Sequence, residues 1–91
     1  MLRSRLARVR CEIARCLFNA NKLEDAEAEL TRALAAAPGF AALYAQRSIV
    51  RERLTMIVGA LKDAQTCVRL SPADAEARQR LAVLSAKYCR Q

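Results

Sequence analysis

The chain has 91 residues, which suits one small domain with a modest hydrophobic core. Hydrophobic residues make up 54% of it but aromatic residues only 4%, and it has two glycines and two prolines, which disfavours a β-sandwich with many tight turns and favours closely packed helices. The formal charge of +7 favours acidic partners, but it does not distinguish an acidic peptide from RNA or an anionic membrane.

The first predicted helix covers residues 4–20 and is rich in arginine. Leu6, Val9, Ile13 and Leu17 recur on one face of it at helical spacing. The arginines of residues 1–15, with Glu12 as the single acid, are also typical of a mitochondrial presequence, but we rank an uncleaved structural helix above that interpretation. No stretch approaches the ~20 apolar residues of a membrane-spanning helix, so we expect no membrane span. A cytoplasmic location is expected because the cysteines are interpreted as reduced thiols.

The second predicted helix covers residues 24–37 and carries one apolar stripe at helical spacing. The stripe consists of Ala26, Leu30, Ala33, Leu34 and Ala37. The helix ends before Pro38 and Gly39, because proline disfavours helical geometry in the preceding residue and glycine permits a reversal. Glu27 and Glu29 are expected to be solvated on the outward face of this helix.

A second pair of helices is predicted at residues 41–54 and 58–70. The later helix is expected to bury Ala60, Leu61, Ala64, Cys67 and Val68. The turn between the two helices is unusually apolar, and its Met56 and Val58 have no evident internal partner, which makes them a candidate second contact patch. The last predicted helix covers about residues 74–89 and is interpreted as a solvating cap.

The chain matches itself at a shift of 34 residues. The shift brings Pro38 onto Pro72 and superposes the small residues Ala7, Ala41 and Ala75. A period of this length is typical of a solenoid, in which each helical pair buries its apolar face against its neighbours. We therefore predict a single all-α domain, an antiparallel helix-pair solenoid with repeats at 7–40 and 41–74 and a capping helix or partial third repeat at 75–91.

The unit length, the matched small residues and the proline that ends each unit resemble tetratricopeptide repeats, over nearly the whole chain. The bulky aromatic residue that this family places near the start of each first helix is matched only by Tyr44, with Arg10 and Arg78 at the other two positions. The RNA-reading pentatricopeptide family has a longer period, which the spacing of the two prolines disfavours. The resemblance implies a protein-binding module in which the first helix of each pair lines a concave groove.

The groove implied by this resemblance is mildly cationic and has apolar patches. Its predicted peptide-binding residues are Arg8, Arg15, Gln46, Ile49, Arg53, Arg80, Val83 and Lys87. Such a surface suits an extended or helical peptide with an acidic end, which would be held by carboxylate contacts and small apolar pockets.

Residues 43–48 resemble a stretch of the co-chaperones that clamp the C-terminal tails of heat-shock chaperones. That clamp uses two lysines, two asparagines and an arginine, of which only Arg80 is retained. The other four positions hold Cys11, Arg15, Gln46 and Glu76. We rank binding of a chaperone tail second, because Glu76 sets a like charge beside the carboxylate that the clamp would hold.

The sequence gives no support for catalysis, a cofactor or a metal site. It has no histidine, no glycine-rich phosphate loop and no nucleophile with a base. Its cysteines, Cys11, Cys16, Cys67 and Cys89, show no CxxC spacing and are expected to be reduced thiols. Binding of nucleic acid or an anionic surface through arginines is a third alternative, which predicts affinity that falls steeply with salt. Self-association is left open as a further kind of partnership.

Overall fold

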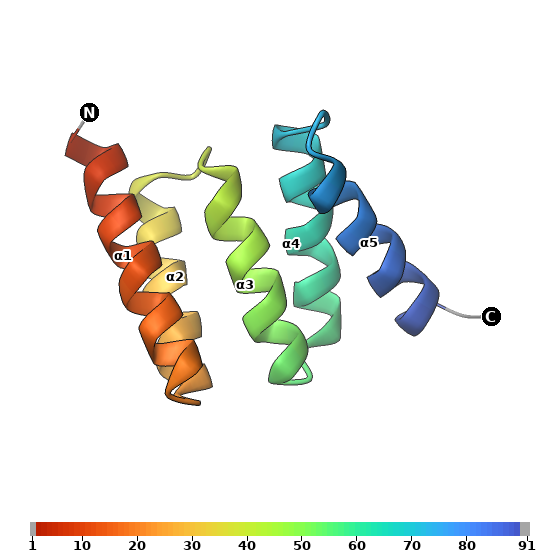
Figure 1. The fold of residues 1–91 in the computed structure, drawn as a ribbon, viewed down its shortest axis with the longest axis horizontal. Coiled ribbons are helices and arrows are strands. Elements are labelled where there is room, and N and C mark those ends of the chain that lie inside the picture. Colours follow the sequence, from red (N-terminus) through yellow and green to blue (C-terminus); the bar gives the residue numbers. More distant parts are fainter. Residues whose placement is uncertain (1, 90–91) are drawn as a thin grey trace.

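The computed structural model describes residues 2–89, with side chains from residue 5 onward, and has five α-helices joined by short turns (Figure 1). The helices are α1 (Leu2–Asn19), α2 (Leu23–Ala36), α3 (Ala41–Arg53), α4 (Ile57–Leu70) and α5 (Ala75–Tyr88). Each begins and ends within two residues of its predicted position, and the prediction of an all-α fold with about five helices is confirmed.

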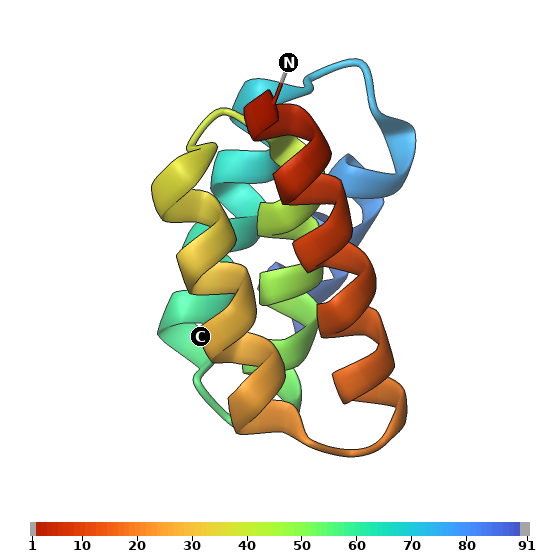
Figure 2. The same cartoon turned by 90° about the vertical axis from the view of Figure 1, so that its left-hand side faces the viewer.

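The helices stand side by side in chain order and alternate in direction (Figure 1). α1 packs on α2 and α3 packs on α4 as antiparallel pairs, the two pairs meet through α2 and α3, and α5 rests on α4 (Figure 2). The resulting slab measures 43 × 29 × 18 Å. This is the arrangement of a helical solenoid, in which each helix contacts mainly its neighbours in the sequence.

The path of the backbone through the turns recurs with the 34-residue period of the sequence. The N–H of Lys22 donates to the carbonyl of Leu17 at 2.8 Å, and in the equivalent later turn the N–H of Met56 donates to the carbonyl of Arg51, also at 2.8 Å. The residues that follow α2 and α4 have φ of −139° and −135° and ψ of 72° and 71°. The turn inside each helical pair, and the residue that follows each pair, therefore have the same backbone geometry in both repeats.

Small and medium apolar side chains fill the space between the helices. In the predicted stripe of α2, Ala26, Leu30, Ala33 and Leu34 are buried and Ala37 is half-buried. The buried apolar residues of α1 and α3 that join them are Ala7, Cys11, Ala14, Leu43 and Val50. Of the five positions predicted for α4, Ala60, Ala64 and Cys67 are buried, whereas Leu61 and Val68 are half-buried. Alanine at the contacts lets the helix axes approach closely, because the distance between axes depends on the side chains between them.

The apolar face predicted for the first helix is largely open to solvent. Leu6, Val9 and Ile13 are 44%, 55% and 42% exposed, and only Leu17 is half-buried against the core. The side of α1 that packs on α2 is instead the one that carries Ala7, which is 1% exposed. The helix therefore forms as predicted, but most of its large apolar residues do not contribute to the core.

The prediction that Glu27 and Glu29 are solvated is wrong. The side chain of Glu29 is only 12% exposed and accepts a hydrogen bond from Arg10 of α1. That of Glu27 is 20% exposed and is paired with Arg51 of α3 at 2.8 Å. Arginines from the neighbouring helices cover both carboxylates, and residue spacing within one helix does not reveal such a contact.

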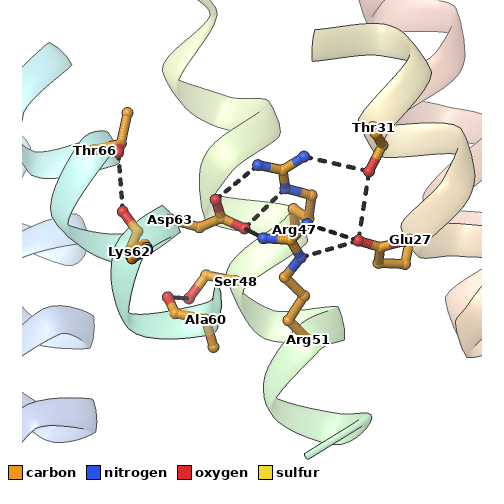
Figure 3. Close-up of polar contacts among 9 residues, drawn as sticks. All are labelled: Glu27, Thr31, Arg47, Ser48, Arg51, Ala60, Lys62, Asp63 and Thr66. Atoms are coloured by element: carbon orange, nitrogen blue, oxygen red, sulfur yellow. Dashed lines mark hydrogen bonds and ion pairs between the residues drawn. The ribbon is translucent and has the colours of Figure 1, made fainter. Parts of the chain in front are cut away.

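A polar network joins α2, α3 and α4 in the middle of the molecule (Figure 3). Arg47 donates through Nε and Nη2 to the two oxygens of Asp63, at 2.8 and 2.9 Å, and Arg51 lies 3.3 Å from the same carboxylate. Arg47 also donates to the hydroxyl of Thr31 on α2, at 3.2 Å. Because Asp63 is nearly inaccessible to water, this network fixes α3 against both of its neighbours.

Candidate functional site

An open groove of about 1000 Å³ runs across the face formed by α1, α3 and α5. α1 and α3 contribute Arg8, Cys11, Arg15, Ala42, Ala45 and Gln46. α5 contributes Glu76, Ala77 and Arg80, and the remaining lining residues come from the C-terminal ends of α2 and α4 and from the segments that follow these helices. Most of the lining residues that lie on helices thus come from α1, α3 and α5.

The charged side chains of the groove are unequally available to a ligand. Arg8, Arg15 and Arg80 line it together with Asp74 and Glu76. The carboxylate of Asp74 accepts hydrogen bonds from the backbone N–H of Glu76 at 3.0 Å and of Ala77 at 3.3 Å, and so caps the N-terminus of α5. Asp74 keeps its negative charge in this role, and Arg15 is itself paired loosely with Glu12 at 3.4 Å, so three arginines stand against two acids and the groove is mildly cationic.

A smaller, largely apolar pocket of about 250 Å³ lies beside the groove, between α1 and α3. It is lined by Ala14, Phe18, Asn19, Ile49 and Val50, together with Arg15 and Gln46. Arg15 and Gln46 line both cavities and therefore mark the boundary between them. An apolar side chain that entered the pocket would stand next to a charged group bound in the groove.

The structure brings together five of the eight predicted peptide-binding residues. Arg8, Arg15, Gln46 and Arg80 line the groove, and Ile49 lines the adjoining pocket.

The other three predicted residues line neither of these two cavities. Arg53 lies over the ring of Phe18, with the guanidinium carbon 5.3 Å from the ring centroid. Val83 is exposed, and Lys87 donates to Glu52 at 3.2 Å. The candidate second patch is separate from the groove, at the turn between α3 and α4, where Met56 and Val58 are both exposed.

Sequence reasoning missed the lining residues that follow α2 and α4, where both segments contribute equivalent positions. Ala37 and Phe40 follow α2, and Ser71 and Asp74 stand 34 positions later, after α4; all four line the groove. The same register that placed the first helices could have found these positions. The prediction considered the first helices only and left these segments out.

Two of the groove residues are thiols, Cys11 and Cys67. Both are buried, and the burial raises the pKa of each thiol above its ordinary value, against the opposing effect of the nearby arginines Arg15 and Arg80. The thiols are therefore protonated at neutral pH and behave as small apolar groups. At the position that holds the first lysine of the chaperone-tail clamp, this chain has an uncharged, weakly polar side chain.

The C-terminal end of α5 is tied to α3 across one end of the groove face. The hydroxyl of Tyr88 donates to Glu52 at 2.8 Å, and the ammonium group of Lys87 donates to the same carboxylate oxygen at 3.2 Å. The bond from Tyr88 is the main cause that lowers the pKa of Glu52 below its ordinary value. These contacts hold α5 in place and leave Lys87 engaged with Glu52.

Within residues 2–89, no three side chains of histidine, cysteine, aspartate or glutamate come together as metal ligands would. In the same part of the chain, no helix has both the length and the apolar character needed to cross a membrane. Comparison of the sequence with protein-family models gave no match, and neither did comparison with curated proteins.

Proposed function

We propose that this chain is a protein-interaction module of the tetratricopeptide type, which binds an extended peptide carrying acidic groups. The observation that carries the proposal is the groove, which Arg8, Arg15 and Arg80 line together with two acids, Asp74 and Glu76, and mostly small apolar residues. Arginine suits this task because its planar guanidinium pairs with a carboxylate through two hydrogen bonds. An apolar side chain of the same peptide would enter the pocket beside Ile49.

The dimensions of the site also support a peptide. A volume of about 1000 Å³ is at the upper end of the range for small-molecule sites, and the groove is open along one face of the slab. An open groove of this kind leaves a small molecule exposed to water, whereas an extended chain can contact the three helices in succession. The proposed compartment is the cytoplasm, where the four free cysteines would stay reduced.

Binding of a C-terminal chaperone tail is a second form of the same proposal. It is supported by Arg80, which lines the groove, and opposed by Glu76, which lines it too. A tail held by its terminal carboxylate would lose affinity when that terminus is amidated. An internal acidic segment would bind equally well with either terminus.

The proposal can be tested by selecting binders from a random peptide library and measuring their affinity by isothermal titration calorimetry. The variant Arg15→Glu with Arg80→Glu should weaken a selected peptide by tenfold or more, since two charge-assisted contacts become repulsive. The matched control is Lys62→Glu with Arg69→Glu, which changes the net charge equally on the exposed surface of α4, outside both cavities.

Equal loss of affinity in the groove variant and the control would refute a specific groove, because general charge would then dominate. A library that yields no acidic binder would refute the proposal as a whole. Titration with a single-stranded RNA oligonucleotide tests the remaining alternative. Tight RNA binding that falls steeply with salt and depends on many arginines would favour nucleic acid instead.

A further inference from the structure

The outer face of α1 carries three large apolar side chains that are each about half exposed to solvent. Leu6, Val9 and Ile13 are 44%, 55% and 42% exposed, and their spacing of three and four residues places them in one stripe along the helix. We call these three residues the α1 stripe. Single exposed apolar residues are ordinary, but an ordered row of three on one helix is the pattern of a helix–helix contact.

The equivalent face of α3 in the next repeat shows what kind of structure packs against this face of a first helix. In the 34-residue register, the α1 stripe corresponds to Phe40, Leu43 and Arg47 at the start of the second helical pair. Leu43 is fully buried in the core, and Arg47 donates to Thr31 of α2. That face of α3 is therefore covered by a helix, whereas the same face of α1 is open at the end of the row (Figure 1).

The charges beside the α1 stripe favour one orientation over the other when two copies of α1 are paired. Arg5 and Glu12 are both exposed and stand seven residues apart, which is nearly two helical turns, so they flank the stripe on the same side. In a parallel pairing, the two-fold axis runs along the helices, so both residues would face the opposite side of the partner's stripe, where Arg10 lies and Arg5 would meet no acid. In an antiparallel pairing centred on Val9, Arg5 would stand within one residue of the level of the partner's Glu12.

We propose that α1 pairs antiparallel with α1 of a second copy of this chain, crossing at Val9. In this pairing Leu6 packs against the partner's Ile13, and two Arg5–Glu12 ion pairs flank the apolar contact symmetrically. Arg10 lies on the other side of the stripe and is paired with Glu29 of its own chain, a carboxylate that Arg32 also approaches to 3.9 Å. Within one chain, Glu12 is paired only loosely, with Arg15 at 3.4 Å on the exposed surface, so it can turn to a partner.

The proposed contact is small, and this sets its strength. Stable interfaces bury roughly 800 Å² on each partner, well above what three half-exposed side chains and two ion pairs offer. The association is therefore a reversible dimer with a dissociation constant in the micromolar range or weaker, roughly 1 μM to 1 mM. The groove lies on another side of α1, at Arg8 and Arg15, and stays open in the dimer.

Sedimentation equilibrium over a wide range of protein concentration tests the association. The average mass should rise from 10.1 kDa toward twice that value. Val9→Glu should weaken association at least tenfold, because it sets two carboxylates against each other at the crossing point. The control is Ala82→Glu, which adds the same charge at an exposed position of α5, the helix at the other end of the row from α1 (Figure 1), and should leave the dissociation constant unchanged. Val58→Glu tests the separate candidate patch at the turn between α3 and α4.

The register is tested separately. Arg5→Glu and Glu12→Arg should each weaken the dimer about threefold, and the double exchange should restore it, as only an antiparallel arrangement allows. Cross-linking is measured in a background with Cys16→Ser and Cys89→Ser. On oxidation, Val9→Cys should form a covalent dimer, because residue 9 meets its own copy at the crossing point. Ile13→Cys should not, because residue 13 faces the partner's Leu6.

A wild-type mass that stays at the monomer value throughout would overturn the proposal and leave the α1 stripe to a different protein. A dimer that Val58→Glu abolishes and Val9→Glu does not would place the contact at the turn between α3 and α4. A dimer that persists without the Val9→Cys cross-link, and without rescue by the double charge exchange, would overturn the antiparallel pairing. Circular dichroism of each variant shows whether it is folded.

Discussion

Asn21 and Thr55 stand 34 residues apart and adopt the same left-handed backbone conformation, with φ of 62° and 61°. Each ends the turn that joins the two helices of a pair. Asparagine tolerates this conformation, whereas threonine is branched at Cβ and is crowded there by its own backbone. The two turns thus share one geometry but reach it at different energetic cost.

Thr55→Asn should therefore stabilise the protein, by about 0.5–1 kcal/mol, because it removes this crowding from a turn whose path is already fixed. The reciprocal change, Asn21→Thr, should destabilise the protein by a similar amount. Urea unfolding followed by circular dichroism measures both. A Thr55→Asn variant less stable than the wild type would show that the exposed hydroxyl of Thr55, which donates to the carbonyl of Leu54, matters more than the backbone conformation.

Asp63→Asn should destabilise the protein strongly, by about 3 kcal/mol, because it removes the carboxylate that Arg47 and Arg51 share in the interior of the molecule. The matched control is Glu12→Gln, where the ion pair is exposed and should contribute less than about 0.5 kcal/mol. Unfolding by urea distinguishes the two. Equal effects would mean that the network around Asp63 is as weak as a surface ion pair.

The link between α3 and α5 should depend on pH. Because the folded pKa of Glu52 is lowered, chiefly by the hydrogen bond from Tyr88, its contribution is complete above the ordinary value of 4.5 and disappears as pH falls through the lower folded value. The free energy of unfolding of the wild type should exceed that of Glu52→Gln by up to about 1 kcal/mol at neutral pH, and the difference should vanish in more acidic solution.

The control for this pH dependence is Tyr88→Phe, which keeps the carboxylate but removes the hydroxyl donor. Its pH profile should lie between those of the wild type and Glu52→Gln. A difference that grew toward acid pH would contradict a lowered pKa for Glu52.

Two thiols should react quickly in the folded protein and two should not. Cys16 and Cys89 are exposed, whereas Cys11 and Cys67 are buried and have raised pKa values. Titration with a thiol-reactive disulfide reagent at neutral pH should show two fast groups in the native state and four after unfolding. Replacing Cys16 and Cys89 with serine should remove the fast phase, and a fast reaction that persisted would show that the groove opens to the reagent.

The sequence alone determined the helices, their order and most of their buried faces. A helix and its buried stripe are recorded in residues three and four positions apart, so Ala26, Leu30 and Ala33 could be assigned to the core without knowledge of any other segment. The shift of 34 residues likewise located the turns, because Pro38 and Pro72 mark equivalent ends of helices. The first helices of the groove followed from the same register.

Only the tertiary structure decided which polar residues are inside and which apolar residues are outside. Glu29 is covered because Arg10 reaches it from another helix, and Val9 is open because no helix of residues 2–89 lies beside it. The segments after α2 and α4 contribute lining residues that helix periodicity does not predict. Lys87, which was predicted to bind a peptide, is paired with Glu52 instead. Periodicity describes one helix at a time, whereas burial and pairing depend on the distances between helices, and those are fixed only when the helices pack together.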